Sequence, residues 1–140
     1  MKKQYLGWFT ACLILLSGCS LNLVGPYDPQ TTAQLQTIDR KIEYMYLSMH
    51  ALEESQRHYD RFAKQYLDLD IDIRALERRQ ERRESNKETL QQVQILAQLW
   101  QQDRKIHQQQ DGLSDFMIKR RQEQYLRLID TIMRGELAKQ

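Results

Sequence analysis

Apolar residues recur every three or four positions over most of the chain after residue 30. The first series is followed by six consecutive polar residues at 53–58 and then by a second series. This spacing gathers the apolar side chains on one narrow face of an α-helix. It predicts a first helix from Thr31 or Thr32 to Leu52 and a second from Tyr59 to about Arg83. The apolar positions are Leu35, Ile38, Ile42, Met45, Met49 and Leu52 in the first series and Tyr59, Phe62, Tyr66, Leu69, Ile73 and Leu76 in the second.

The second half of the chain repeats this spacing between residues that favour turns. Residues 84–87 predict a helix boundary, because serine and asparagine compete for backbone hydrogen bonds. Asp111-Gly112 predicts the end of a third helix, and Ser114 is suited to cap a last helix that reaches Leu137. The apolar positions are Leu90, Val93, Leu96, Ala97, Trp100 and Ile106, then Phe116, Met117, Tyr125, Leu126, Ile129, Ile132, Met133 and Leu137.

Four amphipathic helices with short connections predict an all-α fold, an antiparallel up-and-down bundle of four helices over residues 31–140. The alternative is three helices with a long first helix, because no proline or glycine interrupts residues 53–58 and Leu52 lies one heptad before Tyr59. Glycine and proline between residues 25 and 29 oppose regular structure. They predict that residues 19–30 form a flexible tether.

The N-terminus has the three parts of a signal peptide, which we assign to residues 1–18. Lys2-Lys3 precede an apolar stretch that ends at Leu16, and the small residues Ser17-Gly18 follow. Leu16-Ser17-Gly18-Cys19 resembles the lipobox of bacterial lipoprotein precursors. This resemblance implies cleavage between Gly18 and Cys19, with fatty acids on the sulfur and the new amine of Cys19. The alternatives are an ordinary secretory signal and an uncleaved anchor helix, although the apolar core is short of the ~20 residues that span a bilayer.

Ser20 follows the proposed lipidation site. In the Gram-negative sorting rule that such leaders resemble, aspartate at this position retains a lipoprotein in the inner membrane, whereas serine permits export. The resemblance therefore implies a lipid anchor in the outer membrane, on its periplasmic side. The inner membrane and the cell surface are the alternatives.

Charge and cysteine content narrow the choice of partners. Removal of Lys2 and Lys3 with the signal leaves 21 − 2 = 19 basic side chains against 19 acidic ones. This balance gives no support for nucleic-acid binding. Cys12 leaves with the signal and Cys19 would carry lipid, which excludes a disulfide. We expect attachment to a membrane through Cys19 and binding to an envelope protein of unknown identity, with a homo-oligomer as a further possibility.

Two groups of side chains suggest metal sites. His50, Glu54 and His58 would lie on one helix face, but the outer two would be ~12 Å apart along the axis and could not share one ion. We interpret them as a polar row that faces solvent. Asp68 and Asp70 begin an alternating acidic run that ends at Asp72, but the run lacks the glycine and late glutamate of a calcium loop. A helix flank with its acids outward fits this run better, with a brief extended segment as the alternative. No metal or cofactor is predicted.

Arginines, aromatic rings and glutamines form the remaining candidates. The basic clusters are Arg74, Arg78, Arg79, Arg82 and Arg83, and Lys119, Arg120, Arg121 and Arg127. Interleaved glutamates favour a solvated surface for the first cluster over a phosphate, head-group or glycan site. The aromatic residues Tyr44, Tyr46, Tyr59, Tyr66, Trp100 and Tyr125 are expected in the core, and any that is exposed becomes a candidate contact site. The glutamine-rich residues 91–110 predict an uncharged helix face, either solvated or self-associating.

Four short motifs resemble a group of small lipoproteins of unknown function from Gram-negative bacteria. They are Tyr27-Asp28 with Thr31 or Thr32, Asn86-Lys87-Glu88-Thr89, His107, and Glu136-Leu137-Ala138-Lys139. The similarity spans most of the mature chain and departs at the first connection, which is longer in those proteins. It implies a lipid-anchored helical bundle and no specific activity.

Catalysis has no support in the sequence, which lacks a glycine-rich phosphate loop, a GxSxG elbow and a nucleophile paired with histidine. We therefore predict a non-enzymatic lipoprotein that serves as a binding or assembly accessory of the cell envelope. One alternative is an inhibitor or regulator of a periplasmic enzyme or secretion component. Another is a carrier of small apolar ligands.

Overall fold

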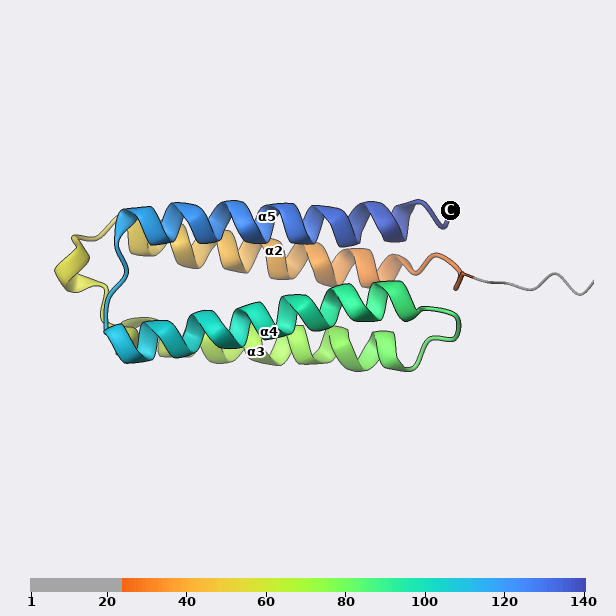
Figure 1. Ribbon diagram of the computed structural model, residues 1–140, viewed down its shortest axis with the longest axis horizontal. Helices are drawn as coiled ribbons and strands as arrows, with labels where there is room; N and C mark the ends of the chain where they lie inside the picture. Colours follow the sequence, from red (N-terminus) through yellow and green to blue (C-terminus); the bar gives the residue numbers. More distant parts are fainter. Residues whose placement is uncertain (1–23) are drawn as a thin grey trace, which may run out of the picture.

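The computed structural model describes residues 24–140, which form an antiparallel bundle of four helices (Figure 1). The predicted all-α fold is therefore confirmed. The helices are α2 (Pro29–His50), α3 (Tyr59–Glu81), α4 (Lys87–Gln110) and α5 (Asp115–Leu137). Each helix packs against the next one along the chain, and α2 also packs against α5. None of these helices is long and apolar enough to cross a bilayer. The predicted lipobox and signal peptide, with Gly18 and Cys19, lie outside the described residues.

The interior follows the predicted apolar stripes. Large rings occupy its middle, where the centroids of Tyr66 and Trp100 lie 5.0 Å apart in a tilted arrangement and Tyr125 lies edge-on to Trp100 at 5.9 Å. Tyr46 lies 6.1 Å from Tyr125. All four of these aromatic residues are almost completely buried. Aromatic side chains of this size contribute much of the apolar area that a small bundle can bury.

The polar residues between the first two helices form a turn, so the alternative of a long first helix is wrong. Helix α2 ends at His50, a short 3-10 helix η1 (Glu54–Gln56) follows, and α3 begins at Tyr59. Arg57 holds this turn from inside. Its guanidinium donates to the carbonyl oxygens of Met49, Leu52 and Leu113 at distances of 2.6 to 3.0 Å.

Helix α2 begins two residues before the predicted cap. Pro29 is its first residue, and the carboxylate of Asp28 accepts from the Gln30 backbone N–H at 3.1 Å. Asp28 also receives two hydrogen bonds from Arg79, at 2.6 and 3.1 Å. Thr31, one of the two predicted caps, is instead buried and accepts from the Gln80 side chain at 2.8 Å. Proline suits a first helical position because its missing N–H has no partner there.

The first described residues are held against the turn between α3 and α4. Ser85 adopts a left-handed conformation with φ of 53° in this turn. Its carbonyl accepts from the backbone N–H of Gly25 at 2.7 Å. A Cβ atom at Gly25 would lie only 2.7 Å from the carbonyl oxygen of Glu84, so this approach requires glycine. Residues 25–28 therefore belong to the folded part of the chain.

Glu136 joins the first described residues to the C-terminal residues at this end of the bundle. Its buried carboxylate accepts from the Asp28 backbone N–H at 2.7 Å, from Arg83 at 2.9 Å and from Lys139 at 2.7 Å. Burial raises the pKa of Glu136, but the donors outweigh it and hold that pKa below its ordinary value. Asp28, the residues after α3 and the C-terminal residues are thereby tied together around one carboxylate.

Candidate binding groove

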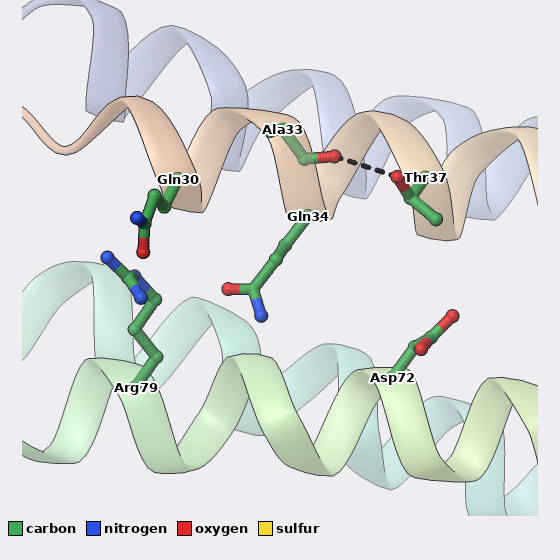
Figure 2. A pocket seen from close by; sticks show the side chains of 6 residues that line it. All are labelled: Gln30, Ala33, Gln34, Thr37, Asp72 and Arg79. Atoms are coloured by element: carbon green, nitrogen blue, oxygen red, sulfur yellow. Dashed lines mark hydrogen bonds between the residues drawn. The ribbon is translucent and has the colours of Figure 1, made fainter.

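An open groove runs between α2 and α3. Its central hollow has a volume of about 320 Å³ and is lined by Gln30, Ala33, Gln34 and Thr37 from α2 and by Asp72 and Arg79 from α3 (Figure 2). A second hollow shares Thr37 and continues toward Tyr44 and Leu69, and a third shares Gln34 and Arg79 and continues toward Arg82. We call this continuous surface the α2–α3 groove.

The centre of the groove contains a polar atom that lacks a partner. Gln34 projects from α2 into the space between the two helices (Figure 2). Its amide oxygen is buried and accepts no hydrogen bond within residues 24–140. A buried acceptor without a donor costs ~1–3 kcal/mol. A donor could reach this oxygen after the Gln34 side chain turns toward the open groove, and the new hydrogen bond would recover that free energy.

The two ends of the groove differ in chemistry. At one end Tyr44 is 66% exposed beside the aliphatic side chain of Leu69. At the other end Arg78 and Arg82 are exposed, near the start of α2. The groove therefore offers an aromatic contact, central amide and hydroxyl groups, and positive charge in that order along its length.

The acids on α3 have different surroundings from those we predicted. Lys41 bridges Asp68 and Asp72, at 2.7 Å from each, across the groove. Asp70 is buried and pairs with Arg104 of α4, so the prediction that all three acids point outward is wrong for Asp70. The helical interpretation of this segment is confirmed.

Arg79 and Arg83, which we expected on a solvated surface, and Arg121 of the second basic cluster are committed to partly buried ion pairs. Arg79 binds Asp28, and this guanidinium holds the pKa of Asp28 well below its usual range. Arg83 binds Glu136. Arg121 lies 2.8 Å from the buried carboxylate of Asp103, which also accepts from Tyr125 at 2.7 Å. The acidic partners are distant in sequence, which is why surface patterning did not indicate them.

The histidines do not share one helix face. His50 lies at the end of α2 and His58 precedes α3, so the predicted single row does not exist. Each is exposed and lies near a different carboxylate: His50 is 3.3 Å from Asp115, and His58 is 3.0 Å from Asp111. Between residues 24 and 140, no three potential metal ligands converge.

His107 is buried and acts as a structural link. Its Nε2 lies 2.7 Å from the carbonyl oxygen of Arg57, and its Nδ1 lies 3.1 Å from the Tyr66 hydroxyl. Because a carbonyl only accepts, Nε2 carries the proton and Nδ1 accepts from the tyrosine. Burial lowers the pKa of His107 from its ordinary value of 6.5.

We expect this histidine to make the fold less stable in mild acid. Its pKa is lower in the folded than in the unfolded chain, so its contribution is complete above pH 6.5 and falls as pH drops through the folded pKa. In His107→Gln, the amide can replace both hydrogen bonds without titrating. The free energy of unfolding, measured with urea, should therefore fall less steeply between pH 7.5 and 5 for the variant than for the wild type. Parallel pH profiles would refute this role.

The groove residues Gln30, Gln34 and Thr37 were missed by the sequence analysis. The sequence does contain a pattern that indicates this surface. These uncharged polar residues recur with Ala33 at helical spacing beside the apolar stripe of α2. We expected any exposed aromatic residue to be a candidate contact site, and Tyr44 is exposed. Tyr46, Tyr66, Trp100 and Tyr125 are in the core as predicted, and Tyr59 packs at its edge.

No protein-family model, curated protein or solved structure matches this chain. The resemblance to small lipoproteins therefore stays a prediction from four short motifs. Residues from three of these motifs meet in the structure: Lys139 donates to Asn86 and Glu136, and Glu136 accepts from Asp28. One hydrogen-bond network around Glu136 thus connects residues of these three motifs.

Proposed function

We propose that this protein is a lipid-anchored, non-enzymatic accessory of the cell envelope that holds a segment of a protein partner in the α2–α3 groove. Cys19 is the proposed lipidation site, and the outer membrane is the proposed location. The unpartnered amide oxygen of Gln34 is the observation that carries the binding role. A backbone N–H of an extended segment is the kind of donor that this oxygen lacks.

The anchor would set the distance between the bundle and the membrane. Gly25 is six positions after Cys19, and a fully extended chain of that length reaches about 20 Å. Residues 25–28 add no reach, because Gly25 and Asp28 are hydrogen-bonded to the bundle. The arginine end of the groove would therefore lie nearer the bilayer than Tyr44. Tyr44 is 15 residues after Pro29, which places it about 22 Å along α2 from the start of that helix.

The lining of the groove favours a protein segment over a small apolar ligand. Gln30, Gln34 and Thr37 offer amide and hydroxyl groups at successive turns, as a peptide backbone requires. Arg78 and Arg82 would favour an acidic residue at one end, and Tyr44 an apolar one at the other. The aromatic filling of the bundle interior supports surface binding over a carrier role.

Photocrosslinking in intact cells tests this proposal. A benzophenone side chain at Tyr44 should capture a discrete protein partner. The matched control is Leu67, which is 54% exposed on the outer side of α3. No adduct at Tyr44, or the same adducts in equal yield from Leu67, would contradict a role for the groove.

Gln34→Leu separates binding from stability. Leucine removes the unpartnered acceptor and fills similar volume, so we expect the free energy of unfolding to stay unchanged or to rise by ~1 kcal/mol. Loss of one buried hydrogen bond to the partner should weaken capture at Tyr44 by about tenfold, which corresponds to ~1.4 kcal/mol. Urea unfolding and adduct yield measure the two effects. A stable variant with undiminished capture would show that Gln34 does not contact the partner.

A further inference from the structure

The arginine end of the α2–α3 groove carries positive charge that the described residues do not fully neutralise. Its hollow has a volume of about 420 Å³. The lining, which we call the arginine hollow, consists of Gln34, Ala75, Arg78, Arg79, Arg82 and Arg83. No acidic residue among residues 24–140 lines it. Arg79 and Arg83 are neutralised by the ion pairs described above, whereas Arg78 and Arg82 are exposed and form no ion pair with the described part of the chain.

The glutamates that interleave with these arginines in the sequence lie on another flank of α3. Glu77 and Glu81 each stand one residue before an exposed arginine and two residues before an arginine that faces α2. These offsets correspond to rotations of about 100° and 200° around a helix. Arg79 and Arg83 face α2, because both donate to residues at its start. The glutamates therefore point away from the arginine hollow and leave its charge in place.

The first described residues run beside the arginine hollow. Arg83 donates to the carbonyl oxygen of Pro26, and Arg79 donates to the carboxylate of Asp28. The proposed lipidation site lies within about 20 Å of extended chain from Gly25. The surface of the membrane that holds the anchor is therefore within reach of the hollow, and this step rests on the proposed function.

We infer that the arginine hollow binds the phosphate group of an anionic membrane lipid between Arg78 and Arg82. These residues lie on one face of α3, about 6 Å apart along its axis. A guanidinium can donate two parallel hydrogen bonds to the oxygens of one phosphate, which suits it better than an ammonium to this group. The short path to the anchor favours a lipid head group over free phosphate. An acidic residue of the protein partner would have to displace the lipid, so the membrane would regulate access to this end of the groove.

Chemical modification of arginine tests this site in the native, full-chain protein. The protein is reconstituted in vesicles of phosphatidylcholine alone, of phosphatidylcholine with phosphatidylglycerol in equal amounts, and of phosphatidylcholine with inorganic phosphate in the buffer. Phenylglyoxal then modifies accessible guanidinium groups, and mass spectrometry locates them. Modification of Arg78 and Arg82 should be at least about threefold slower with phosphatidylglycerol, because a site that is two-thirds occupied is free for a third of the time.

Arg134 is the matched control, because its side chain is 78% exposed two residues before Glu136, at the same end of the bundle. Equal protection of Arg134 would show general contact with an anionic surface. Protection by inorganic phosphate without the anionic lipid would assign the hollow to free phosphate. Either result overturns the inference, as does unchanged modification of both Arg78 and Arg82.

A pair of double variants tests the same site in non-ionic detergent, where binding does not require the anchor. Native mass spectrometry counts the phosphatidylglycerol molecules that the full chain retains. Arg78→Gln with Arg82→Gln should lower the affinity for this lipid by at least about tenfold. Lys119→Gln with Arg120→Gln removes the same charge from exposed positions at the other end of the bundle and should leave the affinity unchanged.

Undiminished lipid retention in Arg78→Gln with Arg82→Gln would overturn the inference. If the same variant lost photocrosslinking at Tyr44, the two arginines would belong to the protein partner instead. Absence of palmitate from the wild-type chain would refute the proposed anchor separately, and the measurement in detergent would still report on the arginine hollow.

Discussion

Asp103→Ala should lower the free energy of unfolding by about 3–5 kcal/mol, the largest loss we expect from a single polar residue. The Asp103 carboxylate is 4% exposed and receives hydrogen bonds from Tyr46 at 3.3 Å and Tyr125 at 2.7 Å. It also pairs with Arg121 at 2.8 Å. Its removal leaves two buried hydroxyl groups and a largely buried guanidinium without their common partner.

The control for this prediction is Gln101→Ala, because Gln101 is an exposed neighbour on the same helix. Asp103→Asn should cost less, ~1–2 kcal/mol, because the amide oxygen still accepts from a tyrosine hydroxyl while the charge pair is lost. Urea unfolding measures all three variants. A loss below 1 kcal/mol for Asp103→Ala would show that this network does not stabilise the bundle.

Arg57→Ala should lower the free energy of unfolding by about 2–4 kcal/mol. Its side chain is buried, and it donates to backbone carbonyls at both connections of one bundle end as well as to Asp115 at 2.6 Å. The backbone carbonyl of Arg57 also accepts a hydrogen bond from the buried His107 side chain. The variant therefore loses the group that joins the turn after α2 to the start of α5.

Two further variants separate the geometry of Arg57 from its charge. Arg57→Lys should be nearly as unstable as Arg57→Ala, because a single ammonium cannot replace the planar set of guanidinium donors. Arg61→Ala, at an exposed position of α3, should change little. Faster cleavage by a glutamate-specific protease after Glu53 or Glu54 in Arg57→Ala would locate the effect at the turn, and an unchanged cleavage rate there would contradict it.

The apolar pattern was sufficient to predict the four helices because each one buries a single continuous stripe. Leu35, Ile42 and Met49 show this directly, since all are buried at the spacing that predicted them. The same stripe on α4 continues through Asp103 and His107, which are polar. The helical spacing places these two side chains in the interior, whereas their polar character is typical of surface residues.

The partners of the buried polar groups could not be predicted, because they come from distant parts of the chain. Asp103 is 57 residues from Tyr46, and Asp28 is 108 residues from Glu136. Only the packing order of the helices brings such pairs together. The α2–α3 groove depends on the same packing, although the uncharged positions Gln30, Gln34 and Thr37 gave a local hint of it.

The proposed membrane attachment and location depend on lipid at Cys19. Metabolic labelling with palmitate, followed by mass spectrometry of the N-terminal peptide, measures this directly in wild type and in Cys19→Ala. We predict a labelled wild-type chain that begins at acylated Cys19 and an unlabelled variant. A native chain that begins at another residue, or that carries no fatty acid, would contradict the proposed anchor.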